Sequence, residues 1–104
     1  MKTLKILALV SLVSMSVFAS SGEHIYKKCA ACHGTMGEKH ALNKSRVVAD
    51  MNVTELSNAL HGYKKGSYGG AMKALMRSQI ATLSDEDIEK VSEYISKIKN
   101  ESDN

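Results

Sequence analysis

The sequence contains few aromatic residues and no proline. It has no Trp and no Pro, and its single Phe, Phe18, lies in an N-terminal segment that we expect to be removed. The rest of the chain must therefore build its core from Leu, Ile, Val, Met and Ala, together with four Tyr residues. Domains of this size are marginally stable, and many depend on a disulfide, a metal or another bound group. The composition therefore predicts that a bound group completes the core.

The sequence also lacks a clear membrane-spanning helix, which needs about 20 predominantly apolar residues. Lys2 and Lys5 instead precede a shorter apolar stretch, interrupted by serines, that ends at the small residue Ala19. This order of basic, apolar and small residues is typical of a secretory signal peptide. We expect residues 1–19 to be removed and residues 20–104 to form one domain. An uncleaved membrane anchor is the alternative.

The two cysteines of the chain stand in the motif Cys29-Ala30-Ala31-Cys32-His33. This C-x-x-C-H pattern is typical of covalent attachment of a c-type haem. Two thiols at this spacing on the first turns of a helix lie on one side, and each can add to a haem vinyl group. His33 then lies under the ring, where an imidazole nitrogen can bind the iron. The motif therefore predicts one covalent haem c, with His33 as the first axial ligand.

Three other uses of the cysteines are weaker. A redox disulfide of the thioredoxin kind accompanies a βαβ pattern, and the sequence indicates no such strands. A structural zinc site usually has four ligands, and only Cys29, Cys32 and His33 cluster here. A plain disulfide in an exported protein is the third alternative, since an oxidising compartment permits it. The remaining histidines, which form no second ligand pair, are His24, His40 and His61.

Apolar residues recur at helical spacing in four places, separated by one long irregular segment. Residues 34–53 show little periodicity, and a segment of this length without regular structure is usually functional in a compact domain. We expect it to wrap around the haem. The predicted helices are one from Gly22 that Gly34 ends, one over 55–60 that Thr54 caps and Gly62 ends, one over 71–80, and one from Ser84 to about Lys99, after which the chain is expected to fray.

The segment from Gly62 to Gly70 is rich in glycine, tyrosine and lysine. We interpret it as a loop, because closely spaced glycines let a backbone approach a ligand. Tyr63 and Tyr68 are candidates for contacts with the haem propionates, and a solvated linker is the alternative interpretation. His61, just before this segment, could bind iron, but an exposed residue at a helix end is the favoured interpretation.

Met72 and Met76 lie one helical turn apart in the third predicted helix. Methionines at this spacing usually pack in the core. In a haem protein with one histidine ligand, however, a thioether can be the second axial ligand and raise the reduction potential. Only one of the two can take that position, and the spacing does not decide between them.

These motifs together resemble the class I cytochromes c, in particular the small soluble monohaem proteins of the bacterial periplasm of the cytochrome c five-fifty-three type. The resemblance covers essentially the whole chain after the signal peptide. The motifs that carry it are Gly22-x-x-Ile25-Tyr26-x-x-Cys29-x-x-Cys32-His33-Gly34, Gly62-Tyr63 with Gly66-Ser67-Tyr68-Gly69-Gly70, and Leu83-Ser84-Asp85-Glu86-Asp87-Ile88 with Tyr94-Ile95.

The resemblance implies two features of the structure. The second axial ligand would be Met76 rather than Met72, because in such proteins it lies a few residues beyond the Gly-Gly pair and about one helical length before the Ser-Asp cap of the last helix. The first and last helices would cross, with Gly22 and Tyr26 against Tyr94.

The absence of proline departs from the pattern of many class I cytochromes c. A proline carbonyl after the haem motif often holds the ligand histidine in these proteins, and such partners orient a metal ligand. This chain has no proline. The carbonyl that would fix His33 therefore cannot be named from the sequence.

We expect an all-α domain of three to five helices wrapped around one haem c. The protein would be a periplasmic electron carrier between respiratory partners, such as a quinol-oxidising complex and a terminal oxidase or peroxidase. Catalysis is not expected, because two axial ligands leave the iron no open position. The alternative is a five-coordinate haem sensor, or a haem subunit of a periplasmic oxidoreductase complex. We expect a monomer with no nucleic-acid partner and no stable membrane insertion after signal cleavage.

Charge is unevenly distributed along the chain. Residues 20–82 carry nine Lys or Arg against four acids, and residues 83–104 carry three Lys against seven acids. Basic residues flank the motifs assigned to the haem, so this segment is a candidate docking face for an acidic redox partner. A solvated surface that only keeps the protein soluble is the alternative.

Overall fold

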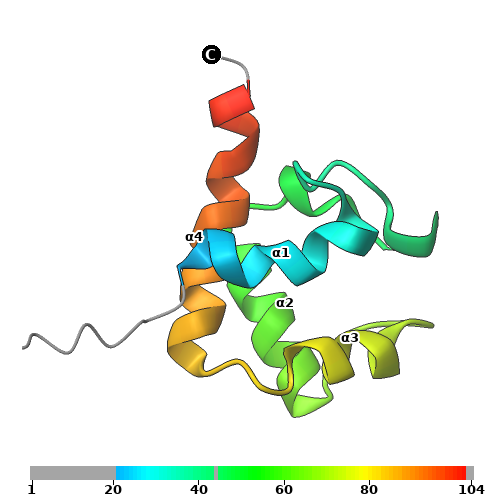
Figure 1. The fold of residues 1–104 in the computed structure, drawn as a ribbon. Coiled ribbons are helices and arrows are strands. Elements are labelled where there is room, and N and C mark those ends of the chain that lie inside the picture. The colour runs from blue at the N-terminus through cyan, green and yellow to red at the C-terminus, as the bar shows by residue number, and fades with distance from the viewer. Residues whose placement is uncertain (1–20, 44, 103–104) are drawn as a thin grey trace, which may run out of the picture.

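The structure, a computed structural model, describes residues 21–43 and 45–102. The expected signal peptide therefore lies outside the described residues. The described chain contains four α-helices, two short 3₁₀ helices and no strand, which confirms the predicted all-α fold (Figure 1). The elements in order are α1 (Gly22–His33), η1 (Ala41–Asn43), η2 (Val48–Asp50), α2 (Val53–Lys65), α3 (Lys73–Ile80) and α4 (Asp85–Ser102). None of the described helices is long and apolar enough to cross a membrane.

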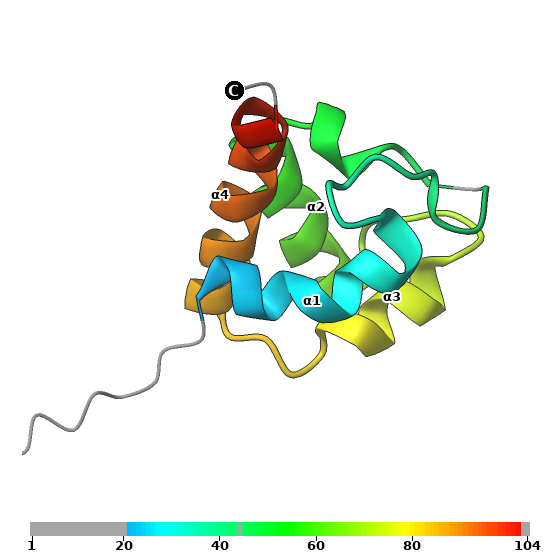
Figure 2. The ribbon, with the colours of Figure 1, turned by 45° about the horizontal axis from the view of Figure 1, so that its top comes forward.

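Helix α1 crosses α4 as the resemblance implied (Figures 1 and 2). The crossing is close at Gly22, where an added Cβ would lie 2.4 Å from the carbonyl oxygen of Lys90 and 2.7 Å from the Cβ of Tyr94. The rings of Tyr26 and Tyr94 pack with their centroids 5.6 Å apart. Glycine at position 22 therefore allows the two backbones to meet.

The core lies where α1, α2 and α4 meet, and its side chains are almost all aliphatic. Ile88 and Val91 of α4 are 0% and 1% exposed, and α4 packs against both α1 and α2. The other members of the core cluster are Ile25, Tyr26, Met51, Leu56, Ala59, Ile80, Leu83, Ile95 and Ile98. The described residues thus form a core that is poor in aromatic side chains, as the composition predicted.

The predicted limits of α2 were wrong at both ends. The helix begins earlier because Asn52, rather than Thr54, caps it: the Asn52 side chain accepts a hydrogen bond from the Glu55 amide at 2.8 Å, and the Glu55 carboxylate accepts one from the Asn52 amide. It also continues through Gly62 and ends at Gly66, whose φ is +82°. A capping side chain and a left-handed glycine do bound the helix, but they are Asn52 and Gly66 rather than the predicted Thr54 and Gly62.

Helices α3 and α4 differ less from their predicted limits. Helix α3 begins at Lys73 rather than Ala71, so Met72 precedes it with a non-helical backbone. Helix α4 is capped by Ser84, whose hydroxyl accepts a hydrogen bond from the Asp87 amide at 3.0 Å, as its sequence indicated. The helix continues to Ser102, beyond the predicted end near Lys99.

Candidate functional site

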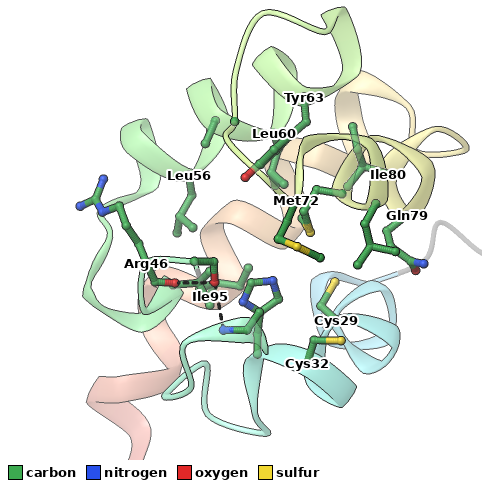
Figure 3. Close-up of a pocket in the computed structure, with 18 of the residues that line it drawn as sticks. Cys29, Cys32, Arg46, Leu56, Leu60, Tyr63, Met72, Gln79, Ile80 and Ile95 are labelled. Carbon is green, nitrogen blue, oxygen red and sulfur yellow. Dashed lines mark hydrogen bonds between the residues drawn. The ribbon is translucent and has the colours of Figure 1, made fainter. Parts of the chain in front are cut away.

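One cavity of about 580 Å³ lies between α1, α2, α3 and the long loop, with α4 at its base (Figure 3). Its volume falls within the range of about 300–1,000 Å³ that is typical of small-molecule and cofactor sites. Most of its surface is apolar, so it favours a large apolar ligand. The aliphatic and methionine residues that line it include Met51, Leu56, Ala59, Leu60, Ile80, Leu83, Val91 and Ile95.

Cys29 and Cys32 both line this cavity from α1. Cys29 is half-buried and Cys32 is exposed, and both are free thiols in the structure. Burial raises the pKa of the Cys29 thiol. Figure 3 shows the two cysteines together on one wall, opposite Leu56, Leu60 and Tyr63 of α2. Both sulfurs are thus on the side of the helix from which a ligand in the cavity could be attached.

His33 ends α1 and is only 6% exposed, although it lines the same cavity. Its Nδ1 atom is buried and has no hydrogen-bond partner among the described residues. Burial lowers the pKa of the imidazole, which favours the neutral form. Neutral imidazole is the form that binds a metal. A buried, neutral histidine beside two thiols at the wall of an apolar cavity fits the iron and porphyrin of a haem.

The chain turns sharply after His33. Gly34 has φ of +88°, a conformation that side chains disfavour, and an added Cβ would lie 2.3 Å from the Glu38 carboxylate. The Gly34 amide donates to the Ala30 carbonyl at 2.8 Å and so closes the last turn of α1. This confirms that Gly34 ends the helix, as the sequence predicted.

Both candidate methionines line the cavity, from the side of α3. Met72 is half-buried and lies just before the helix, and Figure 3 shows it at the cavity wall facing the cysteines. Met76 is also half-buried, lies one turn inside α3, and packs against the core cluster. The structure brings both thioethers to the site and does not choose between them.

Tyr63 and Tyr68 also line the cavity and pack against each other. Their rings meet edge to face, with centroids 4.9 Å apart and planes at 88°. Burial raises the pKa of Tyr63. The close turn between them requires small residues, because a Cβ at Gly62 would lie 2.5 Å from the Cβ of Tyr68. The glycine-rich segment is therefore partly helical and packed, rather than wholly a loop.

Three polar residues at the cavity were not assigned from the sequence. Lys28 donates to the backbone carbonyl of Gln79 at 2.6 Å and links α1 to α3, and both residues line the cavity. Arg46 lines it from the long loop and pairs with Glu55 at 3.2 Å. The sequence held a signal for two of them, since Lys28 precedes the first cysteine and Arg46 lies in the segment expected to wrap the haem.

His61 is not among the residues that line the cavity. Its imidazole instead lies between α2 and α4, where Nε2 contacts the Glu89 carboxylate at 3.0 Å and Nδ1 lies 3.6 Å from Asp85. Ser57 also donates to Glu89, at 2.5 Å. A hydrogen bond from Ser57, and to a smaller extent one from His61, lowers the pKa of Glu89. His61 is therefore half-buried in a contact between helices, rather than a simple exposed residue at a helix end.

The chain is similar to known proteins over most of its length. A family model described as cytochrome c matches residues 19–99. The chain is 37% identical over 83 residues to cytochrome c-553 of Nitratidesulfovibrio vulgaris, which covers 80% of this chain and 81% of that protein. It is 37% identical over 84 residues to cytochrome c-553 of Helicobacter pylori, covering 81% and 84%. It is 38% identical over 73 residues to cytochrome c-553 of Desulfomicrobium norvegicum, covering 70% and 89%.

These matches span most of the chain and include the helix that carries the cysteine motif. They agree with the all-α fold and with a cavity whose walls fit a haem. The chain therefore belongs to the cytochrome c family, as a small class I member of the c-553 type, and is an electron-transfer protein with one covalently bound haem c.

Proposed function

We propose that the chain carries single electrons in the periplasm between respiratory partners, such as a quinol-oxidising complex and a terminal oxidase or peroxidase. In this proposal residues 1–19 are a signal peptide that is removed, and residues 20–104 form the haem domain. The observation that supports it best is the meeting of the C-x-x-C-H motif and two methionines at the walls of one apolar cavity.

We assign the attachment of haem to Cys29 and Cys32 and the axial positions to His33 and Met76. Bound haem c supplies a one-electron couple between ferric and ferrous iron. The aliphatic walls exclude water from it, and a thioether ligand raises its reduction potential. Met76 is preferred because it matches the placement of the axial methionine that the resemblance implies, and it lines the cavity from within α3.

Tyr63 and Tyr68 are proposed to contact the haem propionates. Both line the cavity, and their edge-to-face packing holds the two rings in place. Their hydroxyl groups can donate hydrogen bonds to a carboxylate.

Haem attachment is tested by mass spectrometry of the protein purified from a periplasm. The expected result is a chain that begins near Ser20 and carries the mass of one haem. An unmodified chain with a Cys29–Cys32 disulfide would refute the assignment.

The axial methionine is tested by comparing two variants of the haem-loaded protein. Met76→Ala should abolish the weak near-infrared sulfur-to-iron band of the oxidised protein and lower its reduction potential. Met72→Ala is the matched control and should keep the band, with a loss of stability below the cost of about 2–5 kcal/mol for a fully buried methionine. The reverse pattern would transfer the ligand to Met72. The absence of the band from the unmutated protein would favour a five-coordinate haem sensor or catalytic subunit.

A further inference from the structure

The hydroxyl group of Tyr26 contacts the backbone directly beside His33. Tyr26 is only 3% exposed, and its hydroxyl donates a hydrogen bond to the carbonyl oxygen of Gly34 at 2.5 Å. Burial, with smaller contributions from nearby acidic groups, raises the pKa of this phenol to about 12. Tyr26 is therefore neutral and remains a donor across the physiological pH range.

Gly34 is the centre of a small network of backbone hydrogen bonds. Its carbonyl also accepts a bond from the Gly37 amide at 3.1 Å, and the Gly37 carbonyl accepts one from Ala49 at 3.0 Å. The carbonyl of His33 accepts a bond from the Lys39 amide at 3.0 Å. The Tyr26 hydroxyl is thus the side-chain donor that ties this turn back to α1.

No described residue orients the ring of His33 through a hydrogen bond to its Nδ1 atom. A metal-binding histidine almost always donates its second ring nitrogen to a carbonyl or carboxylate, which fixes the ring. Here Nδ1 of His33 is buried and has no such partner among the described residues. The direction of the ring must then depend on how firmly the backbone at positions 33 and 34 is held.

We propose that Tyr26 is a positioning residue for His33, and that its bond to the Gly34 carbonyl holds the turn that carries the ligand, whose imidazole Nδ1 has no hydrogen-bond partner among the described residues. The inference rests on the proposed function, because it takes His33 to be an axial ligand. The Tyr26 ring packs against Tyr94, so the phenol is anchored at one end by α4 and holds the ligand turn at the other.

The test uses the haem-loaded protein and two variants. Tyr26→Phe keeps the ring and removes the bond to Gly34. Tyr94→Phe is the matched control, because it removes the other hydroxyl of the same aromatic pair and leaves the bond to Gly34 in place. The first measurement is the proton NMR spectrum of the oxidised protein, in which resonances of an iron-bound imidazole are displaced by the paramagnetic iron. The second is the exchange of the Gly37 and Lys39 amides with deuterium.

In Tyr26→Phe we expect the His33 ring resonances to shift or broaden. We also expect the Gly37 and Lys39 amides to exchange about two- to tenfold faster than in the unmutated protein, after correction for any change in the exchange of the α4 amides. A factor of this size is the effect of one hydrogen bond on a local opening equilibrium. In Tyr94→Phe the ring resonances should keep their positions. Equal effects of the two variants on the His33 resonances, or no effect of Tyr26→Phe, would overturn the inference.

The same spectra separate this inference from the proposed function. If the unmutated protein shows no displaced imidazole resonances assigned to His33, the axial assignment fails before any variant is considered. If those resonances are present and do not respond to Tyr26→Phe, only the role of Tyr26 fails.

Discussion

The close crossing of α1 and α4 makes Gly22→Ala a sharp test of the fold. An added Cβ at position 22 would lie 2.4 Å from the Lys90 carbonyl oxygen and 2.7 Å from the Cβ of Tyr94. Ordinary contacts between such atoms are about 3.5 Å or longer, so the helices would have to separate by about 1 Å. Neither neighbouring atom can move by a change of rotamer, because one is backbone and the other is a Cβ. The substitution therefore forces a displacement of whole elements.

Overpacking of this kind typically costs about 1–3 kcal/mol. Alanine recovers up to about 1 kcal/mol relative to glycine through its higher helix propensity, and less at the first position of a helix. The net loss should therefore be about 1–2 kcal/mol, and for a domain of 60–100 residues each kcal/mol lowers the melting temperature by about 4–8 °C. We expect the melting temperature of the haem-loaded protein to fall by about 5–15 °C.

Thermal unfolding followed by far-ultraviolet circular dichroism measures this loss. The matched control is His24→Ala, which places alanine in the same turn of α1 at an exposed position and should leave the melting temperature nearly unchanged. A Gly22→Ala protein as stable as the control would show that the helices do not cross as closely as described.

Three further outcomes are expected. Without haem, a Cys29→Ala/Cys32→Ala chain should show little of the helical circular dichroism of the loaded protein, and native-like helicity would contradict the role of haem in the core. Hydrogen bonds from side chains of α2 lower the pKa of Glu89, so this contact stabilises the fold above the unfolded pKa of about 4.3, and the stabilisation is lost as pH falls through the folded pKa. Glu89→Gln should therefore flatten the fall in melting temperature between about pH 5 and pH 3, and an unchanged slope would argue against this role of Glu89. The electron-transfer rate with an acidic partner should fall with salt, because the Debye length shrinks from about 30 Å at 0.01 M to about 10 Å at 0.1 M. Lys65→Glu should slow association more than Lys97→Glu, and equal effects of the two variants would exclude the basic segment, residues 20–82, as the docking face.

Much of the fold could be predicted because its signals are local. The haem motif, the apolar spacing of α4 and its serine cap each depend on residues within a few positions of one another. The limits of α2 could not be fixed in this way. Gly62 has the residue type that ends a helix, yet it lies within α2, and glycine is needed there because Tyr68 packs against it. That contact depends on the path of the chain after the helix.

The site divides in the same way. Cys29, Cys32 and His33 are neighbours in sequence, and the structure places all three at the cavity. The hydrogen bond from Lys28 to the Gln79 carbonyl joins residues 51 positions apart. Its acceptor is a backbone atom, so it cannot be predicted from the residue type. The same holds for Tyr26, whose aromatic ring was predictable as a packing residue while the partner of its hydroxyl was not.

The scarcity of aromatic residues and the presence of the cavity have a common physical explanation. An enclosed apolar cavity costs about 24 cal/mol per Å³, so a volume of about 580 Å³ would cost about 14 kcal/mol if it were closed and empty. This is an upper bound, because the cavity opens to solvent at the exposed Cys32 and Tyr68. This upper bound is comparable with the free energy of about 5–15 kcal/mol that stabilises a typical domain. We therefore expect the chain to fold poorly without a bound group, and attachment through Cys29 and Cys32 would place that group at the cavity that both cysteines line.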